Sequence, residues 1–201
     1  MPNRHPSNSR ALASRLPLLW LVSDQRNDHH LENALMRLPR GSGFIFRHYH
    51  LPAAARRQRF AHLARIARLR GHTVLLAGTM REARSWGADG AYGAPASLHA
   101  GAGGLRLVTV HSLRELRQSV TARANGVLVS PVFATRSHPQ GRTLGFVRWQ
   151  GIAAHARVPV IALGGMTHHA ASTHSITRWA AIDGLSGESR HSPTSRFPVC
   201  S

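Results

Sequence analysis

Short apolar runs recur along the chain at intervals of roughly 20 to 30 residues, and helical patterns fill most of the intervals. The expected strands span residues 16–22, 43–50, 72–77, 88–93, 105–110, 126–130, 158–163 and 181–185. The expected helices span residues 30–38, 53–71, 80–87, 112–124, 146–156 and 167–180. Most strand segments are continuously apolar, which is typical of parallel strands covered on both faces. Eight strand–helix units predict an α/β fold, a compact TIM (β/α)8 barrel.

The segment after the first strand argues against the main structural alternative, a doubly wound open sheet. Such a sheet would need a glycine-rich phosphate-binding turn at this point, and SDQRND contains no glycine. At the other end, only GESRHSPTSRFPVC follows the last strand, and it is too polar and too proline-containing for a good closing helix. We therefore expect a truncated last helix, with the barrel partly open there or sealed by a partner subunit.

The length of 201 residues favours one domain. We expect a flexible basic arm over residues 1–16, the barrel over 17–190 and a disordered tail over 191–201. The single cysteine, Cys200, allows no internal disulfide and no cysteine-based metal site, which favours a reducing compartment, the cytoplasm. No stretch approaches the roughly 18 apolar residues of a membrane span, and the first residues lack the apolar centre of a secretory signal. Assembly into a homo-oligomer stays open.

The chain is strongly basic, with a formal net charge of +18 from 26 Lys and Arg against 8 Asp and Glu, and all 26 are arginines. Such a charge favours anionic partners. The arginines are nevertheless scattered along predicted helices, as in LARIARLR (63–70), which is more typical of solvated helix faces. Aromatic residues make up 6% of the chain, mostly on predicted strands. We therefore consider nucleic-acid binding the least favoured of the possible functions and expect no nucleic-acid partner.

In a barrel of this kind the site is built from the carboxyl ends of the strands and the loops after them. Side chains alternate along GFIFRHYH (43–50), so Arg47 is expected to point into the barrel near its mouth, opposite Phe46 and His48. An inward arginine is costly unless an anion or a carboxylate meets it. With only 8 acidic residues in the chain, a ligand anion is favoured over a structural ion pair.

Other strand ends carry further candidates. Thr109 and His111 share one face at the end of LVTVHS. The pair Gly164-Gly165 follows the seventh strand and leads into a helix, which suits phosphate binding by backbone amides and also occurs in ordinary tight turns. The sixth strand opens into SPVFATRSHPQG (130–141), either a plain connection or the rim of an anion-binding pocket. After the last strand, the small donors Ser186 and Ser189 are expected to lie beside the glycine pair.

The order of these segments resembles thiamine phosphate synthase and its thiazole-tautomerase relatives, the TenI-type proteins. The resemblance covers roughly residues 18 to 189, and its most specific part is SPVFATRSHP followed by Leu144-Gly145 and then GGM (164–166). It implies a TIM barrel that binds phosphorylated thiazole and pyrimidine small molecules. In the synthase reaction pyrophosphate leaves the pyrimidine diphosphate, and the thiazole nitrogen captures the resulting pyrimidine cation. The resemblance also implies Mg2+ held by two aspartates.

Several positions depart from the family pattern. Tyr49 stands where a lysine is expected, Ala77-Gly78 stand where the family has Asn-Asp, and Ser97 falls near the second metal aspartate. Ligands for Mg2+ are therefore not evident, and we predict no metal-binding residues. Pro131 occupies the place of the catalytic histidine of the tautomerase branch, and a proline there is typical of the synthase.

The strand-end analysis and the resemblance together predict two sets of site residues. The catalytic set is Arg47, Thr109, Thr135 and His138; the set that binds phosphate and substrate is Arg47, His111, Arg136, Gly164, Gly165, Ser186 and Ser189. The function expected first is a thiamine phosphate synthase-like protein with degenerate metal positions. The alternative is a divergent TenI-like barrel that binds a thiazole phosphate, or a similar phosphorylated molecule, without synthase activity.

Overall fold

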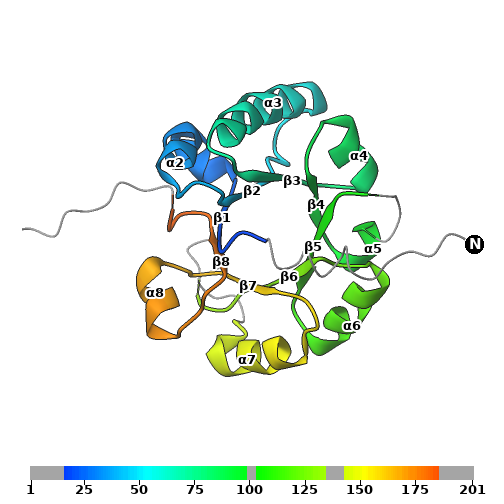
Figure 1. Ribbon diagram of the computed structural model, residues 1–201, viewed down its shortest axis with the longest axis vertical. Helices are drawn as coiled ribbons and strands as arrows, with labels where there is room; N and C mark the ends of the chain where they lie inside the picture. Colours follow the sequence, from blue (N-terminus) through cyan, green and yellow to red (C-terminus); the bar gives the residue numbers. More distant parts are fainter. Residues whose placement is uncertain (1–15, 99–102, 135–142, 186–201) are drawn as a thin grey trace, which may run out of the picture.

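The computed structural model describes residues 16–98, 103–134 and 143–185. Within these ranges eight parallel strands close into a barrel in chain order, and helices surround it (Figure 1). The strands are β1 (Leu19–Val22), β2 (Gly43–Phe46), β3 (Thr73–Ala77), β4 (Gly90–Gly93), β5 (Leu105–Val110), β6 (Gly126–Val129), β7 (Val160–Leu163) and β8 (Trp179–Ala181). The helices are η1 (Gln25–His30), α2 (Leu31–Arg37), α3 (Ala53–Leu69), α4 (Met80–Ser85), α5 (Pro95–Leu98), α6 (Leu113–Thr121), α7 (Gly145–His155) and α8 (His168–Thr173). The predicted TIM barrel is confirmed.

Each strand turns alternate side chains to two apolar layers. The outer layer packs against the helices and includes Leu21, Phe44, Phe46, Val74, Leu76, Val108 and Val129. The inner layer fills the barrel with Trp20, Val22, Ile45, Leu75, Leu107, Leu128, Ile161 and Ala180. Leu16, at the boundary of the expected arm, also packs into this inner layer. The barrel interior is therefore a packed core, and the open region begins only above it, at the strand ends.

Trp20 occupies the largest share of the interior and depends on a glycine on the neighbouring strand. Its indole is fully buried, and Nε1 donates a hydrogen bond to the Pro17 carbonyl over 2.9 Å. Trp20 pairs in register with Gly43 of β2. A Cβ atom at Gly43 would lie 2.1 Å from the indole ring. The indole thus fits inside the barrel because position 43 has no side chain.

Most strands differ from their predicted bounds by a few residues at one end, and two of them, β2 and β8, need a physical explanation. β2 ends at Phe46 because His48 takes a left-handed conformation with φ of 42°, which an extended strand does not allow. β8 spans Trp179–Ala181, so the prediction of a strand over 181–185 and a helix over 167–180 is wrong there. α8 ends at Thr173, and Ser175 with φ of 52° turns the chain into the strand.

Two elements are additional to the prediction. Asp24 accepts a hydrogen bond from the Arg26 amide, and Asn27 accepts one from the Asp24 amide, so SDQRND begins the short helix η1. α5 follows β4. Most of the expected arm, the tail and the segment after β8 lie outside the described residues. None of the helices in the described ranges is long and apolar enough to cross a bilayer.

Candidate functional site

Arg47 lies one residue beyond β2, at the mouth of the barrel, and side chains hold both of its backbone polar groups. Its amide donates to Ser23 Oγ over 2.8 Å, and its carbonyl accepts a hydrogen bond from Arg56 Nε over 2.8 Å. The guanidinium carbon lies 5.7 Å from the centre of the Tyr49 ring. Among the residues that the structure describes, no carboxylate oxygen lies within 4.0 Å of the Arg47 guanidinium. The backbone is therefore held at two points. The guanidinium makes no direct ion pair with a described carboxylate, although its charge lies near enough to Asp24 to help lower the pKa of that carboxyl.

Tyr92 on β4 lies near two predicted site residues, Arg47 and Thr109 of β5. It packs on the inner layer of the barrel, and the Thr109 side chain and the positive charge of Arg47 both act to lower its pKa. Burial raises the pKa of Tyr92, and the nearby positive charge of Arg47 opposes that shift only in part. Tyr92 therefore keeps its proton at neutral pH and can donate a hydrogen bond. Sequence reasoning missed Tyr92, although strand alternation could have placed it on the inward face.

His111 lies apart from Thr109, on the rim between β5 and β6. Its exposed ring uses Nδ1 to donate to the Ser130 carbonyl over 2.6 Å, and its amide donates to Glu115 Oε2 over 2.8 Å. The strand ends at Val110, so His111 no longer follows the alternation of β5. In a neutral ring with the proton on Nδ1, Nε2 is the acceptor.

The glycine pair after β7 brings the loop after β6 close to the barrel. A Cβ at Gly164 would lie 2.8 Å from Pro131 Cα, and one at Gly165 would lie 2.6 Å from the Ala134 carbonyl oxygen. Both residues have positive φ, and Gly164 accepts a hydrogen bond from the Phe133 amide over 3.1 Å. This contact is a packing reason for two glycines here, and their predicted role in binding phosphate stays a prediction. The other predicted residues, Thr135, Arg136, His138, Ser186 and Ser189, lie outside the described residues.

The residues present do not fit the Mg2+ that the resemblance implies. Ala77 and Gly78 offer no side-chain donor at the end of β3, and Ser97 Oγ donates to the Ala94 carbonyl over 2.8 Å. The nearby carboxylate of Glu82 accepts hydrogen bonds from the Thr79 amide and hydroxyl and so serves as a helix cap. In the described ranges no group of three or more His, Cys, Asp or Glu side chains is arranged to hold a metal ion.

Two further aspartates that a metal could recruit are engaged elsewhere. Asp24 caps η1 and pairs with Arg26 Nε over 2.8 Å. Asp89 lies before β4, at the opposite end of the barrel, where its carboxylate accepts a hydrogen bond from the Val74 amide over 2.7 Å. Neither carboxylate lies at the ends of β3 and β4, where the family pattern places its aspartates.

A buried hydrogen-bonded chain lies directly behind Arg47. His48 is 1% exposed, and its two ring nitrogens lie 2.8 Å from Ser23 Oγ and 2.8 Å from Asp28 Oδ1. Arg59 of α3 donates from Nε to the same Asp28 oxygen over 2.8 Å and also pairs with Glu32. Burial lowers the pKa of His48, although Asp28 opposes the shift. Burial on its own would raise the pKa of Asp28, but hydrogen bonds from His48 and Arg59 outweigh this effect, so the pKa is lowered overall.

Acidification is expected to reduce the free energy of unfolding, because His48 and His72 are buried as neutral rings. Burial lowers the pKa of both below the ordinary 6.5, and His72 Nε2 donates to the Leu35 carbonyl. At pH values between the lowered pKa and 6.5, these histidines bind a proton in the unfolded chain but not in the folded chain. The stability present above pH 6.5 is therefore lost as the pH falls through this range. Urea denaturation between about pH 7.5 and 5.5 measures it. A stability that is constant or rises on acidification would contradict the prediction, and His48→Asn should reduce the slope.

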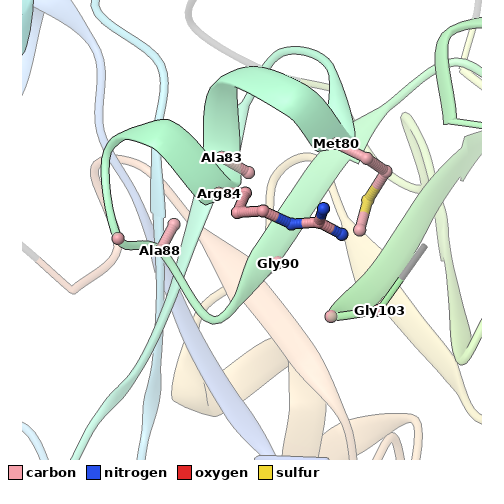
Figure 2. A pocket seen from close by; sticks show the side chains of 8 residues that line it. Met80, Ala83, Arg84, Ala88, Gly90 and Gly103 are labelled. Carbon is pink, nitrogen blue, oxygen red and sulfur yellow. The ribbon is translucent and has the colours of Figure 1, made fainter. Parts of the chain in front are cut away.

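A hollow lies away from the mouth, between α4 and the beginnings of β4 and β5 (Figure 2). Its volume is about 220 Å³, and the Arg84 side chain extends into it from α4 (Figure 2). The remaining lining is small or apolar and includes Met80, Ala83, Gly90, Gly103 and Gly104. In barrels of this kind the beginnings of the strands contribute to stability and the carboxyl ends to chemistry. We therefore place the candidate site at the mouth.

The family model and the curated protein that match this chain are both described as thiamine phosphate synthases. A family model described as "Thiamine monophosphate synthase" matches residues 19–185. Over 59 residues the chain is 32% identical to the "Putative thiamine-phosphate synthase 2" of Aquifex aeolicus (strain VF5). That match covers 29% of this chain and 32% of the relative, so the chain spans about a third of the length of that curated protein.

Solved structures share the fold. The thiamine phosphate pyrophosphorylase from Pyrococcus furiosus superposes with a TM-score of 0.72 at 19% identity, over 88% of this chain and 90% of the other. The thiamine phosphate pyrophosphorylase from Bacteroides thetaiotaomicron gives 0.52 at 16% identity, over 83% and 82%. An aldolase from Escherichia coli K12 gives 0.59 at 9% identity, over 90% and 81%, so the architecture alone does not specify the chemistry. The family match runs from β1 to the segment after β8 and shows the family: the chain belongs to the thiamine monophosphate synthase/TenI family.

Proposed function

We propose that the mouth of the barrel binds a phosphorylated small molecule, in the first place a thiazole phosphate, with the Arg47 guanidinium on its anionic group. The observation that carries the proposal is the environment of this side chain. Arg47 is half-buried at the strand ends, its backbone is held at both polar groups, and no described carboxylate pairs with it. A partly desolvated cation without a partner is costly, and a bound phosphate would offset that cost.

Two hydroxyl groups support a polar ligand at the same mouth. The Tyr92 and Thr109 side chains are neighbours, and Tyr92 lies within the electrostatic reach of Arg47. Each hydroxyl can both donate and accept a hydrogen bond, so either can serve a ligand. A guanidinium with a nearby hydroxyl donor suits a phosphate monoester better than an uncharged ligand.

The coupling of thiazole phosphate to a pyrimidine diphosphate is the second candidate, and family membership favours it. Departure of pyrophosphate requires cations that absorb the developing charge. This family depends on Mg2+ for that purpose, and Ala77, Gly78 and Ser97 do not supply its ligands. Arg47 is one cation at the mouth that could act on the leaving group, but the metal ligands are missing from the described residues, so we place ligand binding before coupling.

Thiazole phosphate is expected to bind in the presence of EDTA, because the proposed anion site uses a guanidinium and no metal. Isothermal titration calorimetry with the purified chain measures this directly. In parallel, both substrates are incubated with the chain with and without Mg2+, and the coupled product is quantified. Binding without product supports the proposal. Product formation that Mg2+ stimulates would select the synthase instead, and absence of binding in both buffers would refute the anion site.

A further inference from the structure

We propose that His48 is a positioning residue, which acts through Ser23 to hold Arg47 in its ligand-binding orientation. The inference rests on the proposed function, since Arg47 must take an anion for its position to matter. Ser23 follows β1 and His48 follows β2, so the pair joins two neighbouring strand ends below the mouth. Both residues are almost completely buried, with exposures of 0% and 1%. Neither can touch a ligand, and any effect on binding has to pass through Arg47.

The directions of the hydrogen bonds follow from the donors available. Arg47 N–H donates to Ser23 Oγ, so the hydroxyl proton of Ser23 remains for His48 Nδ1, 2.8 Å away. Nδ1 is then the acceptor of the neutral ring, and the proton lies on Nε2, which donates to Asp28 Oδ1 over 2.8 Å. Arg59 fixes Asp28 from the other side. The chain of donors therefore runs in one direction, from the Arg47 amide to a carboxylate held on η1.

The backbone of His48 gives independent support. Its φ of 42° is left-handed, a conformation that is uncommon for residues other than glycine. The ring stacks on Phe46 at 4.7 Å with an interplanar angle of 7°. Residues in such conformations persist only where the surroundings hold them, and they gather at functional sites. Here two hydrogen bonds and two ring contacts, to Phe46 and His50, hold the residue that directly follows Arg47, and so set the direction in which the chain leaves it.

The order Ser23, His48, Asp28 is also that of a hydrolase triad, but the geometry excludes a nucleophile. A catalytic serine must be reachable by substrate and free to lose its proton to the histidine as it attacks. Ser23 is 0% exposed, and its oxygen already accepts the Arg47 amide proton. The same three groups here form a support beneath the site.

The experiment compares binding of thiazole phosphate to the full chain and to five variants by calorimetry. Ser23→Ala removes the acceptor of the Arg47 amide. His48→Gly and His48→Asn both tolerate positive φ, but only asparagine keeps an acceptor near the position of Nδ1. Arg47→Ala tests the proposed function itself, and Arg65→Ala, an exposed residue of α3, is the control. Circular dichroism and a cooperative thermal transition establish folding of each variant.

We expect affinity to fall about 10-fold in Ser23→Ala and His48→Gly, the order of one hydrogen bond, and to be largely recovered in His48→Asn. Nitrogen NMR of His48 in the unmodified chain should show the neutral Nε2–H tautomer. If Arg47→Ala loses binding while Ser23→Ala and His48→Gly keep it, this inference is wrong and the proposed function stands. Equal losses in His48→Asn and His48→Gly, or an Nδ1–H tautomer, also overturn it. If the unmodified chain does not bind, or Arg47→Ala binds normally, both proposals fail.

Discussion

Replacing Arg47 by alanine is expected to weaken thiazole phosphate binding strongly and to leave the barrel folded. The side chain adds no packing to the core, because Ile45 and Phe46 fill the inner and outer layers at this end of β2. A hydrogen bond to a charged group contributes about 1.5–3 kcal/mol, so loss of the guanidinium should weaken binding by about 100-fold. Calorimetric titration measures the affinity, and urea denaturation measures the stability of the same variant.

Arg65→Ala is the matched control for this change. Arg65 is exposed on α3, so its replacement removes the same charge without touching the mouth. If both variants lost affinity equally, the effect would come from the overall positive charge and not from one guanidinium. Retained affinity in folded Arg47→Ala would remove the basis of the proposed site.

Gly43→Ala should cause a large loss of stability. The added methyl carbon would lie 2.1 Å from the ring of Trp20, which is completely buried and bonded to the Pro17 carbonyl. The indole cannot move out of the way without opening the barrel interior. The overpacking should therefore lower the free energy of unfolding by at least about 1–3 kcal/mol. Chemical denaturation at constant pH measures the change.

The same substitution at Gly151 should change the stability in the opposite direction. Gly151 lies exposed within α7, and a Cβ there would meet nothing within 4 Å. Alanine in such a helix position is worth up to about 1 kcal/mol over glycine, so this variant should be slightly more stable. Equal stability of the Gly43→Ala and Gly151→Ala variants would show that the barrel interior relaxes around the extra carbon.

The barrel could be predicted from sequence because its strands are apolar on both faces, and such runs differ plainly from the helices between them. The errors arose where local pattern and tertiary structure disagree. AIDGL has the composition of a strand, but the strand is the preceding WAA, which pairs with β1 and β7. The helical pattern of 167–180 continues past Thr173, and only the left-handed Ser175 ends it. Serine carries no strong signal for that conformation.

The site could be predicted only in part. Alternation was enough to bring Arg47 and Thr109 to the mouth, because it depends on the strand alone. The hydrogen-bond partners of the Arg47 backbone come from other parts of the sequence, Ser23 after β1 and Arg56 on α3. Contacts between residues so far apart in sequence follow from the closed barrel, which composition and spacing do not specify in detail. The Ser23–His48–Asp28 chain has the same origin.

Closure of the ring through β8 has a consequence for synthesis on the ribosome. β8 is three residues long, yet it pairs with both β7 and β1, from opposite ends of the chain. Until residues 179–181 emerge, a nascent chain has two unpaired edges, one on β1 and one on β7, and such edges are templates for pairing with other chains. The synthesis of these three residues therefore determines when the growing polypeptide no longer exposes strand edges that can pair with other chains.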